Sequence, residues 1–356
     1  AAAQLWNARP VDTGDELDLD VTGVAHGGVF VGRIEDPADD SGRGGRVVFV
    51  PDAIPGERVR IRLTDVGKKS FWRGEVLEVL DASPHRRPHI WRQADLSVPP
   101  HLRPGGADFG HIELTHQRAL KLEVLTDALK RFGGVESPGI GIHPAGEAGE
   151  GETDDGSRWR TRVSLHVDAD GYVGPFAARS HSVIAVEEYP LATAAVEQAA
   201  LQLALARPGR IDLVQPADGR VRVIPRADAA KSGPREAREV ITERVGDRDF
   251  RVDAGGFWQV HRLAAATLDG AVRAAILDLA SRGTALDPEA AHLDLYGGVG
   301  LLAATVAELG GTRVTSVESD ARATEHAGWN LSEWVGARAE TARVDRYVSR
   351  LLAEDP

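Results

Sequence analysis

One stretch near the carboxyl-terminal end constrains the fold more than any other. Residues 291–303 have the sequence AHLDLYGGVGLLA, which predicts a short apolar strand, a glycine-dense turn and the first turn of a helix. A second β-rich run, residues 313–317, ends on Glu318. This order of strand, glycine turn, helix and acidic residue after the next strand is typical of a nucleotide-cofactor site in a parallel α/β sheet.

The glycine pattern alone leaves the ligand open. Residues 298–303 also fit the G-x-G-x-x-A pattern of dinucleotide sites, which is a weak signal by itself. Asp294 stands just before the glycines, where a carboxylate would repel a pyrophosphate. S-adenosylmethionine carries an ammonium and a sulfonium and no phosphate, so acidic residues suit it. We therefore expect S-adenosylmethionine; the alternatives are a dinucleotide and a turn that binds no ligand.

Length and composition narrow the class of protein. A chain of 356 residues is long enough for two or three domains, each with its own core. No apolar run reaches membrane-spanning length and no secretion signal opens the chain, so we expect a soluble, cytoplasmic protein, and a monomer. The chain has no cysteine, which excludes disulfides, thiolate metal sites and iron–sulfur clusters, and no histidine spacing suggests a metal.

Residues 15–82 show five short β-rich runs separated by turn signals, a pattern that predicts a small closed barrel of the OB type. The whole chain has a net charge of -12, yet residues 56–92 hold nine Lys or Arg against five acidic residues. Such basic residues interleaved with aromatics favour phosphate contact and base stacking. The predicted RNA-binding residues are Arg58, Arg60, Arg62, Lys68, Lys69, Trp72 and Arg73; the alternative is a solvated strand face with a core Trp.

The middle of the chain changes character. A proline-rich connector leads to a helix expected over residues 115–132, whose apolar stripe we assign to the core: Leu120, Val124, Leu125 and Leu129. From residue 158 the pattern predicts an α+β region, with strands near 159–167, 172–177, 183–186, 210–215, 220–225, 240–245 and 248–252, and a helix near 192–206. Arg158, Arg160 and Arg162 alternate, so they form either a second RNA-facing strip or surface ion pairs.

Residues 253–261 precede a long amphipathic helix, expected over 262–281. A hydrophobic staple for that helix would explain Phe257 or Trp258, but it would not explain the amide of Gln259. We therefore expect Gln259 to contact the cofactor.

The barrel segment resembles the TRAM domain, an RNA-binding OB-like module. The residues that carry this resemblance are Ala25-His26-Gly27-Gly28, Val48-Phe49-Val50-Pro51, Ile54-Pro55-Gly56-Glu57 and Ser83-Pro84-His85-Arg86. Together with Phe257-Trp258-Gln259 and the glycine turn, in this order, the chain resembles the TRAM-containing uracil-5 RNA methyltransferases over nearly all of residues 15–355.

The resemblance implies roles for particular residues. Gln259 would contact the cofactor, Tyr296 would pack beside it, Glu318 would bind its ribose hydroxyls and Asp345 would meet the adenine amine; with Asp294 and Gly298 these form the predicted cofactor site. Other residues occupy the positions of the family's iron–sulfur cysteines, in Pro104-Gly105-Gly106-Ala107 and Glu188-Tyr189-Pro190-Leu191. We therefore expect no cluster.

The mechanism that the resemblance implies is covalent: a cysteine thiolate adds to C6 of uracil, C5 attacks the methyl group, and a carboxylate removes the C5 proton. We expect this cysteine and this base to lie beyond Pro356 or to be absent, and we assign no catalytic residue in this chain. The target uridine would lie in ribosomal or transfer RNA, in a loop or flipped out of its stack.

The sequence thus predicts a multidomain protein: an OB-like TRAM barrel over 1–83, an α+β domain over 84–255, and over 256–356 the first part of a Rossmann-like class I methyltransferase domain. Two other functions stay open. One is a catalytically inactive RNA-binding protein that keeps the methyltransferase scaffold, and the other is an NAD-dependent oxidoreductase.

Overall fold

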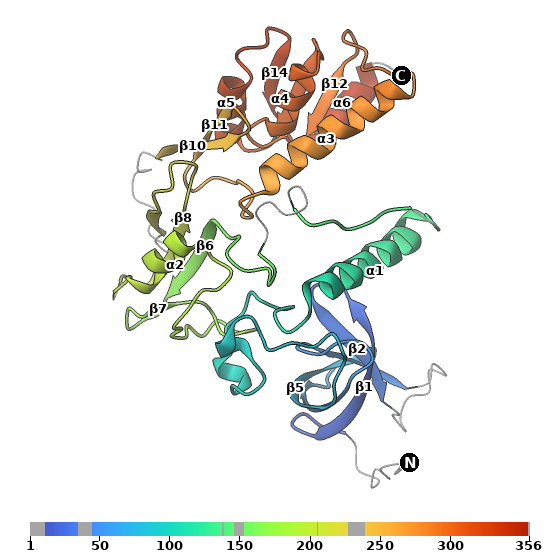
Figure 1. The fold of residues 1–356 in the computed structure, drawn as a ribbon, viewed down its shortest axis with the longest axis vertical. Helices are drawn as coiled ribbons and strands as arrows, with labels where there is room; N and C mark the ends of the chain where they lie inside the picture. Colours follow the sequence, from blue (N-terminus) through green and yellow to red (C-terminus); the bar gives the residue numbers. More distant parts are fainter. Residues whose placement is uncertain are drawn as a thin grey trace. The chain divides into compact units, whose positions relative to one another are not determined.

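The computed structural model describes residues 11–34, 45–136, 139–145, 153–204, 206–226 and 239–354 (Figure 1). They belong to two compact units, one of Ala1–His143 with Pro175–Val186 and one of Pro144–Gly174 with Glu187–Pro356. This division is coarser than the three domains expected from the sequence, whose boundaries remain a prediction. Among the described helices, none combines the length and the apolar character needed to cross a membrane.

The first unit contains the predicted barrel. Its strands are β1 (Glu16–Ala25), β2 (Val29–Ile34), β3 (Arg46–Val50), β4 (Arg58–Asp65) and β5 (Phe71–Asp81), closed in the order β1-β2-β3-β5-β4. The residues of β1 alternate between the two faces, which buries Leu17, Leu19 and Val21 in the interior. Gly32 has to be small, because a Cβ there would lie 2.4 Å from the carbonyl oxygen of Asp20.

A buried ion pair joins the barrel to the connector that follows it. Glu57 is 1% exposed, and its carboxylate accepts hydrogen bonds from Arg86 Nε at 2.6 Å and Arg86 Nη2 at 2.7 Å. The same carboxylate accepts the backbone N–H groups of Ile54 at 2.9 Å and Ser83 at 3.1 Å. A buried charge is tolerated when its lone pairs are filled in this way.

The connector passes through two short 3₁₀ turns, η1 (Arg92–Ala94) and η2 (Pro100–Leu102), to α1 (Leu114–Gly133), which confirms the helix predicted there. Gly134 ends it in the left-handed region at φ 64°, with its N–H bonded to carbonyl oxygens of the last turn. Leu120 is buried and joins Ile112 in the barrel core. Leu125, however, is 43% exposed, so the expectation that the whole apolar stripe is core is wrong.

The second unit begins with an antiparallel sheet in the order β7-β6-β8-β9, followed by a separate β10-β11 hairpin. The elements are β6 (Arg162–Val167), β7 (Val173–Gly174), α2 (Ala194–Leu201), β8 (Gly209–Val214), β9 (Arg222–Arg226), β10 (Val240–Val245) and β11 (Arg248–Asp253). The strand expected over 183–186 is absent: among those residues only Val183 forms a bridge, to Phe176 in the first unit. The helix expected over 192–206 is shorter than predicted.

The unit ends in a parallel sheet with helices. After α3 (Ala264–Ser281), the chain runs through β12 (His292–Leu295), α4 (Leu301–Glu308), β13 (Val314–Glu318), α5 (Ala321–Asn330), β14 (Ala337–Thr341) and α6 (Val344–Glu354). The strand order is β12-β13-β14, with β13 parallel to both neighbours. Residues 314–317 of β13 are all buried, as expected for a strand covered on both faces.

Candidate functional site

The glycine turn between β12 and α4, which we call the glycine bend (residues 296–300), has an unusual backbone. Tyr296, Gly298 and Gly300 all have positive φ, at 61°, 55° and 87°. Positive φ is uncommon for a non-glycine residue, and Tyr296 is 78% exposed. Gly297 must lack a side chain because a Cβ would lie 2.0 Å from Ser316 Oγ on β13. The glycines therefore bring the backbone against the ends of the parallel strands.

Asp294 supports the helix that follows the bend. Its Oδ2 accepts the backbone N–H of Ala303 at 3.0 Å, in the first turn of α4, and lies 3.5 Å from the Ser316 hydroxyl. Burial is the main cause that raises the pKa of Asp294, and the nearby charge of Glu318 acts in the same direction. Asp294 thus has a structural role at the predicted cofactor site.

Glu318 connects the bend to the next strand and helix. Its Oε2 accepts the N–H of Gly298 at 3.2 Å, while Oε1 accepts the N–H groups of Ser319 and Asp320 at 2.6 and 2.9 Å. The carboxylate lies at the carboxyl end of β13, the edge at which parallel sheets bind nucleotides. Asp294, Gly298 and Glu318 are therefore brought together as the sequence predicts.

Tyr296 and Asp345 lie near a common neighbour, Arg343. Asp345, in the first turn of α6, accepts two hydrogen bonds of 3.1 Å from Arg343, and these lower the pKa of the Asp345 carboxyl. The phenol of Tyr296 lies in the neighbourhood of Arg343. The side chain of Asp345 is 62% exposed, so its carboxylate is accessible from solvent.

Gln259 follows a turn that other residues hold firmly. Arg162 Nη1 donates to the carbonyl oxygens of Gly256 at 2.8 Å and Ala254 at 3.3 Å, and Arg226 Nη2 donates to that of Gly255 at 3.0 Å. Arg162 itself pairs with the buried Glu243 at 3.0 Å. These hydrogen bonds could not be predicted from the sequence, because the arginines lie 29 or more residues from the turn.

The same turn is tied to the helix that follows Glu318. Asp253 is 3% exposed and accepts His326 Nε2 at 2.7 Å and Arg322 Nε at 3.1 Å, both from α5. Trp258 packs against Phe250 and against the buried cluster that includes Val299 of the bend, while Phe257 is 78% exposed. The side chain of Gln259 makes no hydrogen bond within the described parts of the chain.

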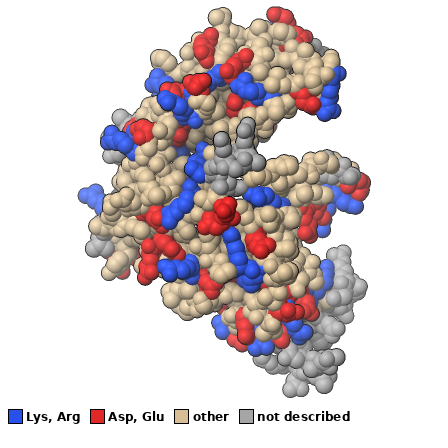
Figure 2. Space-filling model, in the orientation of Figure 1, with Lys and Arg blue, Asp and Glu red and all other residues tan. Residues whose placement is uncertain are grey.

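The predicted RNA face of the barrel carries acids as well as arginines. Asp18, on β1, lies opposite Arg60 and binds it at 3.0 Å and Arg58 at 3.8 Å; Arg62 binds Glu16 at 2.9 Å and Glu75 at 3.2 Å. These pairs offset much of the positive charge of Arg58, Arg60 and Arg62. On the face drawn in Figure 2, basic and acidic side chains are likewise intermixed.

The adjoining loop and β5 present a different surface. Lys68 Nζ lies 4.8 Å and the Arg73 guanidinium 5.5 Å from the ring centre of Phe71. Lys68, Lys69 and Arg73 are exposed, and no described carboxylate lies within ion-pair distance of them. We call Lys68, Lys69, Phe71 and Arg73 the aromatic corner of the barrel.

Trp72 does not belong to this surface. It is 6% exposed and lies in the barrel core, so the faces of its ring are not open to a base. The prediction that Trp72 stacks on RNA is therefore wrong. Strand parity gives the reason: residues 71 and 73 point outward, whereas 72, 74 and 76 point inward. Strand alternation places Phe71 on the same outward face as Arg73, so the sequence alone could have identified Phe71 as a surface aromatic residue.

The hypothesis of a second RNA-facing arginine strip is also wrong. Arg158 pairs with Glu197, and the side chain of Arg162 is 10% exposed beside Glu243. Arg160 donates to the carbonyl oxygen of Arg162 at 3.1 Å. The ion-pair alternative holds for Arg158 and Arg162, although Arg162 is nearly buried, whereas Arg160 bonds to the backbone. No cluster of three metal-ligating side chains occurs among the described residues.

Comparison with known proteins relates the barrel to one domain family and the whole chain to RNA methyltransferases. Residues 10–77 match the TRAM domain family. Two Streptomyces proteins described as uncharacterized RNA methyltransferases are each 32% identical: that of Streptomyces avermitilis over 95% of this chain and 80% of its own length, and that of Streptomyces coelicolor over 96% and 77%. A 23S rRNA (uracil(1939)-C(5))-methyltransferase of Halomonas elongata is 35% identical over 49% of this chain and 32% of its own length.

A solved structure has a similar fold. The tRNA (uracil-54, C5)-methyltransferase of Pyrococcus abyssi, in complex with S-adenosyl-L-homocysteine, aligns with a TM-score of 0.57 over 88% of this chain and 79% of its own. Its sequence is 19% identical, so this likeness concerns the fold alone.

Proposed function

We propose that this chain, a member of the TRAM-containing uracil-5 RNA methyltransferase family, binds S-adenosylmethionine at the glycine bend and presents it to a uracil of ribosomal or transfer RNA. The observation that carries the proposal is the pair of carboxylates, Asp294 and Glu318, at the start of α4. The helix N-terminus is electropositive and would suit a pyrophosphate, but two acids beside it favour a cationic ligand without phosphate.

The residues present fit this cofactor. Glu318 lies where ribose hydroxyls would donate to it, and the acids provide counter-charge for an ammonium. Tyr296 presents an exposed ring beside the bend, with the exposed carboxylate of Asp345 as the acceptor proposed for an adenine amine. Gln259 follows the turn held by Arg162, and its amide makes no hydrogen bond among the described residues. The bound cofactor would supply an electrophilic methyl group.

RNA would contact the aromatic corner of the barrel. Lys68, Lys69 and Arg73 can approach phosphates, because no described acid neutralises them, and Phe71 offers a ring for stacking. Arg58, Arg60 and Arg62 remain candidates at the edge of this surface, with their charge shared with Asp18, Glu16 and Glu75.

The chemical step needs a nucleophile that this sequence does not contain. A thiolate adduct at C6 requires cysteine, and the 356 residues include none. We therefore propose that this chain binds the cofactor and the RNA. We assign the attack on C6 to none of its residues. The second candidate function is an RNA-binding protein that keeps the methyltransferase scaffold.

Calorimetry and methyl transfer together test the proposal. We expect the chain to bind S-adenosylhomocysteine and not NAD; tight NAD binding would instead favour the oxidoreductase. Incubation of the full-length encoded protein with labelled S-adenosylmethionine and ribosomal or transfer RNA then separates the two candidates. Label at carbon 5 of uracil supports the methyltransferase, whereas cofactor and RNA binding without transfer supports the scaffold function.

A further inference from the structure

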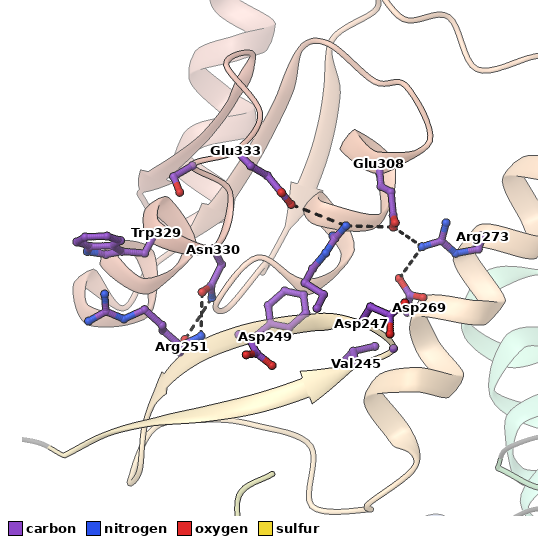
Figure 3. Close-up of a pocket in the computed structure, with 14 residues that line it drawn as sticks. Val245, Asp247, Asp249, Arg251, Asp269, Arg273, Glu308, Trp329, Asn330 and Glu333 are labelled. Atoms are coloured by element: carbon purple, nitrogen blue, oxygen red, sulfur yellow. Dashed lines mark hydrogen bonds and ion pairs between the residues drawn. The ribbon is translucent and has the colours of Figure 1, made fainter. Parts of the chain in front are cut away.

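A pocket of about 700 Å³ lies in the second unit, outside the glycine bend (Figure 3). The β10-β11 hairpin forms one side, and α3 with the carboxyl-terminal ends of α4 and α5 forms the other. This volume lies within the range of small-ligand sites and can hold a nucleoside. None of the predicted cofactor residues lines it.

Trp329 and Arg251 form the most distinctive feature of this pocket. The Arg251 guanidinium lies 4.5 Å from the ring centre of Trp329, and even so 58% of Trp329 is exposed. The indole therefore retains surface for a flat ligand. Within the described ranges no carboxylate lies at ion-pair distance from Arg251, so its charge is available to an anion.

Apart from Arg251, the pocket lining carries two arginines, Arg248 and Arg273, and five carboxylates, those of Asp247, Asp249, Asp269, Glu308 and Glu333. Arg248 binds Glu308 at 3.2 Å and Arg273 binds the same carboxylate, while Asp249 binds Arg244 at 2.8 Å. Figure 3 shows Asp247 on the opposite side of the pocket from Trp329. Of the three lining arginines, Arg251 alone has no ion pair with a described carboxylate.

Asn330 fixes this arrangement. Its Oδ1 accepts the Arg251 N–H at 2.8 Å, and its Nδ2 donates to the Arg251 carbonyl oxygen at 3.2 Å. The same Nδ2 donates to the carbonyl oxygen of Val299 in the glycine bend at 2.9 Å. The backbone of Arg251 is therefore held next to Trp329, and the pair is tied to the cofactor bend.

We propose that Trp329 and Arg251 form a nucleotide subsite, in which an unstacked base of single-stranded RNA stacks on the indole and its phosphate contacts the guanidinium. The inference rests on the proposed RNA substrate and adds a contact on the second unit. Aromatic rings bind unstacked bases of any sequence, and a stacked arginine contributes both charge and planar contact.

The test uses the full chain and a short, labelled, single-stranded RNA of mixed sequence, followed by fluorescence anisotropy over a range of salt. Trp329→Ala lowers affinity about 5- to 100-fold. It leaves the salt dependence unchanged, because stacking releases no counterion. Arg251→Gln lowers affinity and reduces the slope of log K against log salt by about 0.7, the value for one phosphate contact on a single strand.

Two matched variants control for general effects. Trp329→Phe keeps a ring and retains most of the affinity, and Tyr172→Ala removes a 63% exposed aromatic from the same unit without effect. Cross-linking of 5-bromouridine RNA, mapped by mass spectrometry, yields the peptide that contains Trp329. Equal thermal midpoints establish that the variants are folded.

The outcomes separate this inference from the proposed function. Wild-type protein that binds neither this RNA nor ribosomal or transfer RNA overturns both, and wild-type protein that binds only ribosomal or transfer RNA overturns the subsite alone. Wild-type protein that binds RNA, with Trp329→Ala binding it equally well, overturns the subsite alone.

Discussion

The backbone N–H of Gly298 donates to the carboxylate of Glu318 across 3.2 Å, although the two residues are 20 positions apart in the chain. This bond joins the glycine bend to the end of the neighbouring parallel strand. It also orients the carboxylate that we propose for the ribose.

Glu318→Ala should weaken the binding of S-adenosylhomocysteine about 10- to 100-fold, because a charged acceptor for ribose hydroxyls is lost. Isothermal titration calorimetry measures this directly. Glu325→Ala, which removes an exposed acid from the neighbouring helix α5, is the matched control and should bind as wild type. Equal affinities for Glu318→Ala and wild type would place the ribose elsewhere.

Asp294→Asn should separate the structural role of this side chain from its role in binding. The amide oxygen can still accept the Ala303 N–H, and burial disfavours the charged form of Asp294, so the free energy of unfolding should stay equal or rise. Affinity for S-adenosylhomocysteine should fall about tenfold, because its ammonium loses a counter-charge. Affinity for adenosine, which has no ammonium, should change little; an equal loss for both ligands would contradict this assignment.

Phe71→Ala and Trp72→Ala should have different effects, although the residues are adjacent. Loss of Phe71 should weaken RNA binding about 5- to 100-fold and leave the barrel folded. Loss of the buried Trp72 should instead cost about 3–5 kcal/mol of stability. Chemical denaturation and RNA anisotropy on both variants provide the comparison, and a stable Trp72→Ala protein with impaired RNA binding would restore the original assignment.

His111 should make the first unit sensitive to acid. Burial lowers the pKa of His111 from 6.5 to about 3, with its Nε2 hydrogen-bonded to the Ala53 carbonyl oxygen. The unfolded chain takes up this proton near pH 6.5 and the folded chain does not, so stability falls as the pH drops from 6.5 toward 3. The slope approaches about 1.4 kcal/mol per pH unit.

His111→Gln keeps a donor and does not titrate, so denaturation curves between pH 7 and 5 should show a shallower slope for this variant than for wild type. Some slope remains, because burial also lowers the pKa of the neighbouring His89. An identical slope for the variant and wild type would show that His111 is not the responsible group.

Sequence patterns within single segments correctly predicted most of the secondary structure. The five barrel strands, α1, α3 and the β12-bend-α4-β13 unit follow from alternation, helical periodicity and glycine placement. The strand expected over 183–186 failed because a short apolar run does not ensure a partner strand.

Contacts between distant segments were beyond sequence reasoning. Arg60 could be placed on an outward face, but its pairing with Asp18, 42 residues earlier, depends on the β1-β4 register. The Trp329 pocket combines residues from five elements, and none of its lining residues belongs to a motif identified in the sequence. Asp294 was correctly placed beside the bend, whereas its bond to Ala303 depends on how α4 leaves the turn.

The buried bond between Glu57 and Arg86 determines where the barrel could be excised as an autonomous folding unit. A fragment that ended at residue 83 would leave the Glu57 carboxylate in an apolar interior without its counter-ion, and it would remove Ile112 and Leu120 from the core. An isolated RNA-binding fragment would therefore have to continue through the first half of α1.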